Sequence, residues 1–86
     1  MKAIDKAIKM CDDVSNIYVT RRNKYYVDVK LGKSNPYISA MISKTLKKDK
    51  RVEGLMSSPT SWEVLIEGDD NATYIKNLLS GFGNIM

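Results

Sequence analysis

The chain has 86 residues, 43% of them hydrophobic and 28% charged, a composition typical of one globular domain rather than of a disordered segment. It has no histidine and one cysteine, which excludes an intrachain disulfide and argues against a zinc site or histidine-based catalysis. Its net charge is +4, it shows no signal-peptide pattern, and no apolar run approaches the roughly 20 residues of a membrane span. We therefore expect a cytoplasmic, non-enzymatic domain with no membrane contact and no cofactor or metal.

Residues 2–14 have the pattern of an amphipathic helix. Apolar side chains recur at helical spacing, with charged residues between them: Ile4, Ala7, Ile8, Cys11 and Val14. Cys11 lies within this stripe, so we interpret it as a core residue rather than as a reactive thiol.

Residues 17–31 predict a β-hairpin with arms over 17–20 and 25–31 and a turn over 21–24. Asn23 tolerates the left-handed backbone that such turns favour. Alternation assigns to the core face Ile17, Val19, Tyr25, Val27, Val29 and Leu31. It assigns to the outer face Tyr18, Thr20, Tyr26, Asp28 and Lys30.

A second helix is predicted over residues 36–48, because Asn35 can cap it and Pro36 suits its first position. Its apolar side carries Ile38, Met41, Ile42, Thr45 and Leu46. Residues 52–56 predict a short strand, and 57–61 a loop.

The C-terminal third predicts a strand over residues 62–67 with Trp62, Val64 and Ile66 toward the core. A helix over 72–80 follows, ended by Gly81 and Gly83, with an apolar face of Tyr74, Ile75, Leu78, Leu79 and Phe82. Asp69 and Asp70 could form an acidic metal-binding pair, but capping of this helix by Asp70 or Asn71 explains them more simply.

These elements give the order α-ββ-α-ββ-α in a single domain over residues 1–86. The fold class is therefore α+β, and the simplest packing is a four-stranded antiparallel sheet with the helices on one face. Domains this small are often stabilised by oligomerisation, so a homo-oligomer is compatible with the sequence.

Positive charge is concentrated in the middle of the chain. Residues 20–51 carry ten basic side chains against Asp28 and Asp49, a sum of +8, whereas residues 52–86 sum to −4. The basic residues are Arg21, Arg22, Lys24, Lys30, Lys33, Lys44, Lys47, Lys48, Lys50 and Arg51. Such a cluster predicts contacts with phosphates, and the alternative is an ordinary solvated surface.

Tyr18 and Tyr26 could stack on unpaired bases from the outer face of the hairpin. The alternatives are that they are ordinary outer-face strand residues, or that a second subunit covers them. The glycine–aromatic consensus of RRM domains is absent, and so is a helix-turn-helix signal. RNA or single-stranded nucleic acid is therefore a better candidate ligand than a specific DNA duplex.

In its segments Arg21-Arg22-Asn23-Lys24 and Lys47-Lys48-Asp49-Lys50-Arg51, and in its abundant Lys, Asn and Ile, the chain resembles the small early proteins of T-even-type phages. Among these it is most similar to the RNA-binding factors that inhibit the host toxin–antitoxin system ToxIN. The resemblance is compositional, so it assigns no functional residue. It implies an RNA-dependent inhibitor of a host toxin or nuclease, acting in the host cytoplasm.

The leading hypothesis is thus a non-enzymatic protein that binds RNA or single-stranded nucleic acid. It predicts binding that weakens steeply with salt and is mostly removed by Arg21→Glu combined with Arg22→Glu. The alternatives are a protein–protein inhibitor or adaptor whose basic face binds an acidic partner, and a structural assembly unit.

Overall fold

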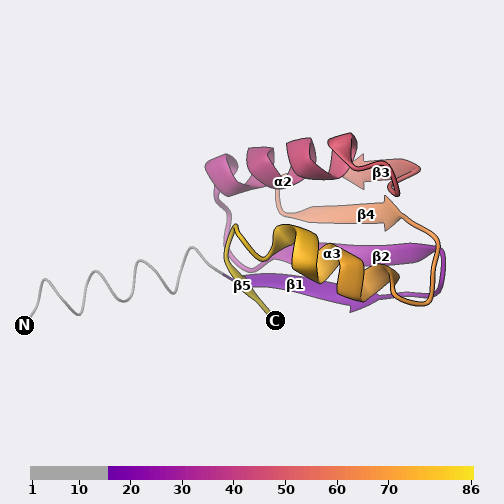
Figure 1. Ribbon diagram of the computed structural model, residues 1–86. Coiled ribbons are helices and arrows are strands. Elements are labelled where there is room, and N and C mark those ends of the chain that lie inside the picture. The colour runs from indigo at the N-terminus through magenta and orange to yellow at the C-terminus, as the bar shows by residue number, and fades with distance from the viewer. Residues whose placement is uncertain (1–15) are drawn as a thin grey trace, which may run out of the picture.

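The computed structural model describes residues 16–86, and the helix predicted over residues 2–14 lies outside this range. The fold is a five-stranded sheet with two helices packed on one of its faces (Figure 1). The order of the strands across the sheet is β3-β4-β2-β1-β5. The elements are β1 (Asn16–Arg21), β2 (Tyr26–Leu31), α2 (Pro36–Lys48), β3 (Gly54–Ser57), β4 (Ser61–Leu65), α3 (Asn71–Leu79) and β5 (Asn84–Ile85).

β1 and β2 form the predicted antiparallel hairpin, in which Ile17 pairs with Leu31 and Arg21 with Val27. The predicted core residues of these strands are buried, with the exception of Tyr25, which lies in the turn and is 43% exposed. The expected left-handed conformation at Asn23 is also wrong, because no non-glycine residue in the described range has a positive φ. Asn23 forms the turn through its side chain, whose oxygen accepts hydrogen bonds from the N–H groups of Tyr25 and Tyr26.

α2 begins and ends where the sequence predicts. The Asn35 side chain accepts hydrogen bonds from the N–H groups of Tyr37 and Ile38, and Pro36 occupies the first turn. Ile42 and Leu46 are fully buried against the sheet, whereas Met41, predicted on the apolar side, is 41% exposed. The helix therefore buries a narrower stripe than its sequence pattern suggests.

The predicted four-stranded antiparallel sheet is incomplete, because residues 84–85 add a fifth strand that runs parallel to β1. Their pairing continues through the N–H of Met86, which donates to the carbonyl of Ile17. β3 and β4 form the second antiparallel pair, and Trp62, Val64 and Ile66 are buried as expected. A strand of two residues is too short to show an alternation of apolar and polar residues, and it forms only by pairing with the edge of β1. The local sequence pattern therefore could not predict it.

α3 begins at Asn71, but Asp70 does not cap it with its side chain, contrary to one of the two capping options above. The Asp70 carboxylate is instead hydrogen-bonded to Arg51. The Asn71 side-chain oxygen accepts from the N–H of Ala72, the first residue after it. Ile75 and Leu79 fix this helix on the sheet, where both are fully buried.

Candidate nucleic-acid interface

The ten basic residues of the middle segment do not share one surface. Arg21, Arg22 and Lys24 lie at the hairpin turn, at the end of the molecule where α2 finishes and α3 begins (Figure 1). Lys50 and Arg51 follow α2 at this same end, whereas Lys33 lies in the loop between β2 and α2 at the opposite end. Lys30 belongs to the outer face of the sheet, and Lys44, Lys47 and Lys48 project from α2.

The outer face of the sheet is the face opposite the two helices, and its side chains form cross-strand rows. Tyr18, Lys30 and Ser61 make one row, Thr20, Asp28, Glu63 and Met56 the next, and Tyr26, Leu65 and Gly54 the third. The register thus confirms that Tyr18 and Tyr26 share this face. They lie in different rows, however, with the row of Asp28 and Glu63 between them.

Arg22 folds back over this central row. Its guanidinium donates two hydrogen bonds to the Asp28 carboxylate, at 2.6 and 3.0 Å, and lies 3.2 Å from a Glu63 oxygen. Asp28 and Glu63 are directly opposed on neighbouring strands, an arrangement that is unfavourable for two like charges. Hydrogen bonding to Asp28 and then to Glu63 raises the pKa of Arg22 above its ordinary value. Arg22 therefore acts as the counterion of this carboxylate pair.

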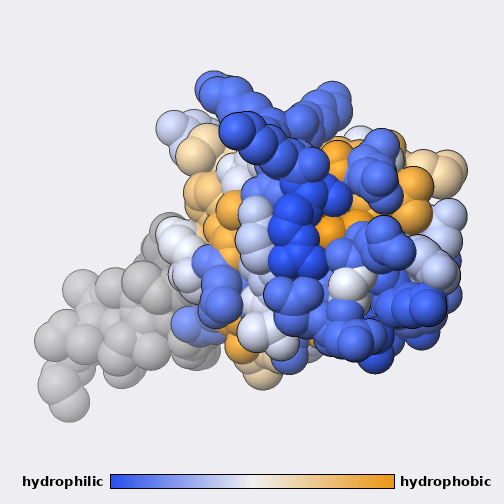
Figure 2. Space-filling model, turned by 45° about the vertical axis from the view of Figure 1, so that its right-hand side comes forward, coloured by the Kyte–Doolittle hydropathy of each residue, from blue (hydrophilic) through white to orange (hydrophobic). Residues whose placement is uncertain are grey.

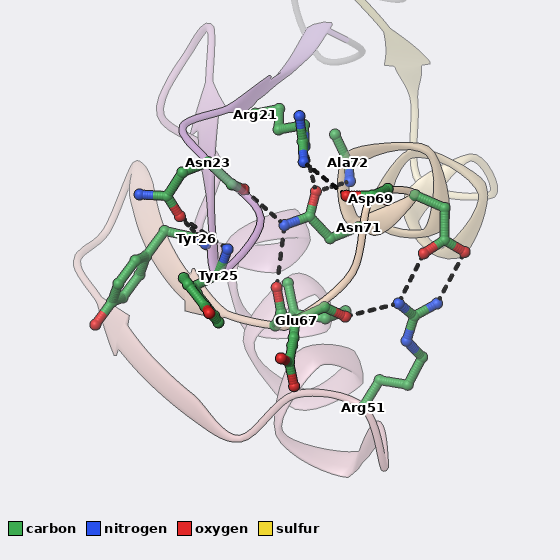
Figure 3. Close-up of polar contacts among 11 residues, drawn as sticks. Arg21, Asn23, Tyr25, Tyr26, Arg51, Glu67, Asp69, Asn71 and Ala72 are labelled. Atoms are coloured by element: carbon green, nitrogen blue, oxygen red, sulfur yellow. Dashed lines mark hydrogen bonds and ion pairs between the residues drawn. The ribbon is translucent and has the colours of Figure 1, made fainter.

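Arg21 binds the first turn of α3 (Figure 3). Its Nε donates to the Asn71 side-chain oxygen at 3.2 Å, and its guanidinium lies 3.7 Å from Asp69. The Asn71 amide nitrogen donates in turn to the carbonyls of Asn23 and Ile66, at 2.9 and 3.0 Å. Asn71 is fully buried, so it ties the hairpin turn, the end of β4 and α3 together within the protein interior.

Arg51, which follows the C-terminal end of α2, joins that end of the helix to the segment before α3. It holds both Asp70 oxygens, at 2.9 and 3.2 Å, and donates to the Glu67 carbonyl (Figure 3). Its guanidinium also lies 4.4 Å from the centre of the Tyr74 ring. The Tyr74 hydroxyl donates to Asp49, and this bond, together with burial, raises the pKa of Tyr74 above 10.0. All three arginines are thus engaged by carboxylates. The −4 charge of residues 52–86 was the signal in the sequence for such pairing.

The Arg51–Asp70 pair predicts a loss of stability in acid. Hydrogen bonding to Arg51 lowers the pKa of Asp70 below its ordinary value of 3.8. The stability that this pair provides is therefore complete above that value and is lost as the pH falls through the lowered pKa. We expect Asp70→Asn to melt below the wild type at pH 7 and the two melting temperatures to converge in acid. Asp69→Asn is the control, because Asp69 is fully exposed; a difference that stays constant down to pH 2 would contradict the prediction.

The lysines of α2 differ from the arginines, because Lys44, Lys47 and Lys48 are exposed and make no ion pair within the described range. We call these three residues the lysine ridge. Their spacing places them on the side of α2 opposite Ile42 and Leu46. Hydrophilic side chains project from the top of the molecule in Figure 2, at the level of α2 in Figure 1.

Two further residues on the exposed side of α2 were missed at the sequence level. Tyr37 is 79% exposed, and Met41 follows it one helical turn later, next to Lys44. The spacing of Tyr37, Met41, Lys44 and Lys48 places them along one side of the helix. An exposed aromatic ring in line with exposed lysines could be found from the sequence once the helix phase was assigned.

The remaining candidates have individual positions. Lys24 lies 5.3 Å from the centre of the Tyr25 ring, and the guanidinium of Arg22 lies 5.7 Å from that of Tyr26. Tyr18 is 41% exposed, and Tyr26 is half-buried. Among residues 16–86 no cluster of metal-ligating side chains forms, and no helix there is long and apolar enough to cross a membrane.

Comparison with known proteins adds no relative to this description: no family model, curated protein or solved structure matches the chain.

Proposed function

We propose that the protein is a non-enzymatic RNA- or single-strand-binding protein that contacts phosphates through the lysine ridge, with Lys50 beside it. The observation that supports this most is the contrast between the two kinds of cation. Arg22 and Arg51 are held by carboxylates and Arg21 by the Asn71 amide, so approach of a phosphate would have to displace a bidentate or networked partner. Among residues 16–86 the ridge ammonium groups meet no such competitor, and they can release counterions when a polyanion binds.

Tyr37 extends this surface toward the N-terminal end of α2. Bases of a single strand stack on exposed aromatic rings regardless of their identity, whereas a duplex keeps its bases inside. A surface of lysines in line with a tyrosine therefore favours single-stranded over double-stranded nucleic acid. The likeness of the basic segments to phage RNA-binding factors supports the wider proposal that binding serves to inhibit a host toxin or defence enzyme.

Charge reversal in the ridge tests the proposal. We expect Lys44→Glu, Lys47→Glu and Lys48→Glu each to weaken binding of a labelled 15-nucleotide RNA, and each to reduce the slope of log K against log salt by about 0.7. Lys76→Glu is the matched control, since it changes the net charge equally at an exposed lysine of α3. Equal losses from the control and the ridge variants, or salt-independent binding, would contradict the proposal.

A protein partner is the competing candidate, supported by the exposed Tyr37 and Met41 beside the ridge. In this version the lysines contact an acidic protein surface and RNA is incidental. Purification from the native host with and without nuclease separates the two. A stoichiometric protein retained after nuclease treatment favours the adaptor, whereas bound material absorbing at 260 nm that nuclease removes favours nucleic acid.

A further inference from the structure

The outer face of the sheet contains a hollow that the ridge does not use. Its volume is about 590 Å³, and it extends over the rows of Tyr18 and of Thr20. This volume is within the range of about 300–1,000 Å³ that holds small planar ligands in other proteins. Its lining includes Tyr18, Lys30, Met56 and Glu63.

The floor of the hollow is a fixed hydrogen-bond acceptor. Glu63 gives one oxygen to Arg22, and no hydrogen bond within the described range engages its other oxygen. Arg22 donates two hydrogen bonds to the Asp28 carboxylate, and these bonds fix the guanidinium beside Glu63. The carboxylate of Glu63 is 38% exposed, so a ligand can reach it. It therefore suits a ligand that carries N–H donors.

Two exposed apolar side chains, Tyr18 and Met56, line the hollow among mostly polar residues. The Tyr18 ring lies against Gly32, where even a Cβ atom would come within 2.9 Å of the ring, so a larger residue there would push the ring away. Met56, which is 71% exposed, lies at the far end of the next row on β3. Tyr18 and Met56 thus offer a ring and a polarisable thioether to a flat ligand. Lys30, beside Tyr18 in its row, adds a positive charge at the rim.

We propose that this hollow binds one unpaired guanine of a single-stranded nucleic acid, an inference that rests on the function proposed above. Guanine presents two adjacent N–H donors on its Watson–Crick edge, and both can converge on the Glu63 oxygen that Arg22 does not engage, whereas uracil presents one donor between two carbonyl acceptors. Tyr18 stacks on the base, Glu63 accepts from its edge, and Lys30 contacts the neighbouring phosphate. The hollow and the lysine ridge face different sides of the domain, so a strand that uses both must pass around the edge of the sheet at β3, which α2 contacts. The ridge supplies affinity for any strand, and the hollow adds a preference among bases at a second point of that strand.

The test compares two labelled RNA heptamers, seven uridines and the same strand with a central guanosine, by fluorescence anisotropy at one salt concentration. We expect the wild type to bind the guanosine heptamer about tenfold more tightly. Glu63→Gln should remove this preference and leave the affinity for oligouridine unchanged. Tyr18→Ala should weaken binding of the guanosine heptamer, whereas Tyr18→Phe, which keeps the ring, should not.

A measurement on the unmodified chain makes the test independent of how the variants fold. The guanosine heptamer should shift the amide resonances of the residues around the hollow in β1, β2 and β4 more than oligouridine does. Equal binding of both heptamers with equal shifts would overturn the guanine site and leave the ridge standing. No binding of either heptamer by the wild type would overturn the proposed function itself. A dimer that Tyr18→Ala dissociates would also overturn the guanine site, because a second copy would then occupy the face.

Discussion

Asn71→Ala should destabilise the domain by about 3 kcal/mol or more, because several buried hydrogen-bonding groups lose their partner at once. The carbonyls of Asn23 and Ile66 would lose their donor, and Nε of Arg21 its acceptor. A buried group left unpaired costs about 1–3 kcal/mol, and Asn71 is fully enclosed, so water cannot easily replace the amide. Urea unfolding followed by the fluorescence of Trp62, the one tryptophan, measures the effect.

Two variants make this prediction specific to the amide. Asn71→Asp preserves shape and the acceptor for Arg21, but turns an oxygen toward two carbonyl oxygens, so we expect it to destabilise the fold as well. Asn77→Ala is the matched control, because Asn77 is an exposed residue of the same helix. It should change the free energy of unfolding by less than about 0.5 kcal/mol. A similarly small effect of Asn71→Ala would show that the amide is dispensable.

The sequence predicted those helices and strands whose formation depends on residues close to one another in the chain. Asn35 and Pro36 mark the start of α2, and the alternation around Trp62 and Val64 marks β4 and its buried face. Each of these signals is local, since caps and pleats involve residues a few positions apart. The fifth strand had no such signal, because residues 84–85 become a strand only by meeting the edge of β1.

The candidate interface was predicted less well for the same physical reason. Arg21 looked like a free cation at a hairpin tip, but its partner Asn71 lies 50 positions further along the chain. Arg22 and Arg51 are likewise paired with residues of the acidic C-terminal third, through Glu63 and Asp70. Opposite charges segregated along a sequence can face each other once the chain folds. For this reason the phosphate contacts that we now propose are those of the lysines of α2.

These pairings also change what charge reversal at the hairpin would mean. Arg22→Glu would place a third carboxylate beside Asp28 and Glu63, and Arg21→Glu would bring another to Asp69. Lost binding in the double variant predicted from the sequence would therefore not distinguish a missing phosphate contact from a damaged sheet. The ridge lysines give a cleaner test, because none of them makes an ion pair within the described range.

Trp62→Ala should leave the domain largely unfolded at 25 °C. Trp62, the second residue of β4, is the largest buried side chain and is 2% exposed, and truncating such a residue costs about 3–5 kcal/mol. The core of a domain this small rarely supplies more than about 3–5 kcal/mol in total, so one cavity can consume the whole margin. Circular dichroism should show lost secondary structure and no cooperative thermal transition.

Variants that remove the indole N–H or its acceptor distinguish the contribution of hydrogen bonding at Trp62 to stability from that of packing. The indole N–H donates to the Ser43 hydroxyl at 2.9 Å and so joins β4 to α2. Ser43→Ala leaves that donor without its partner and should cost about 1–3 kcal/mol. Trp62→Phe keeps a ring in the core and frees a hydroxyl that is half-buried and able to meet water. Ser43→Ala leaves the indole N–H without an acceptor, and Trp62→Phe removes that N–H altogether. The double variant should therefore lose less stability than the sum of the two single variants. Strictly additive losses would mean that the Trp62–Ser43 bond contributes nothing to holding α2 on the sheet.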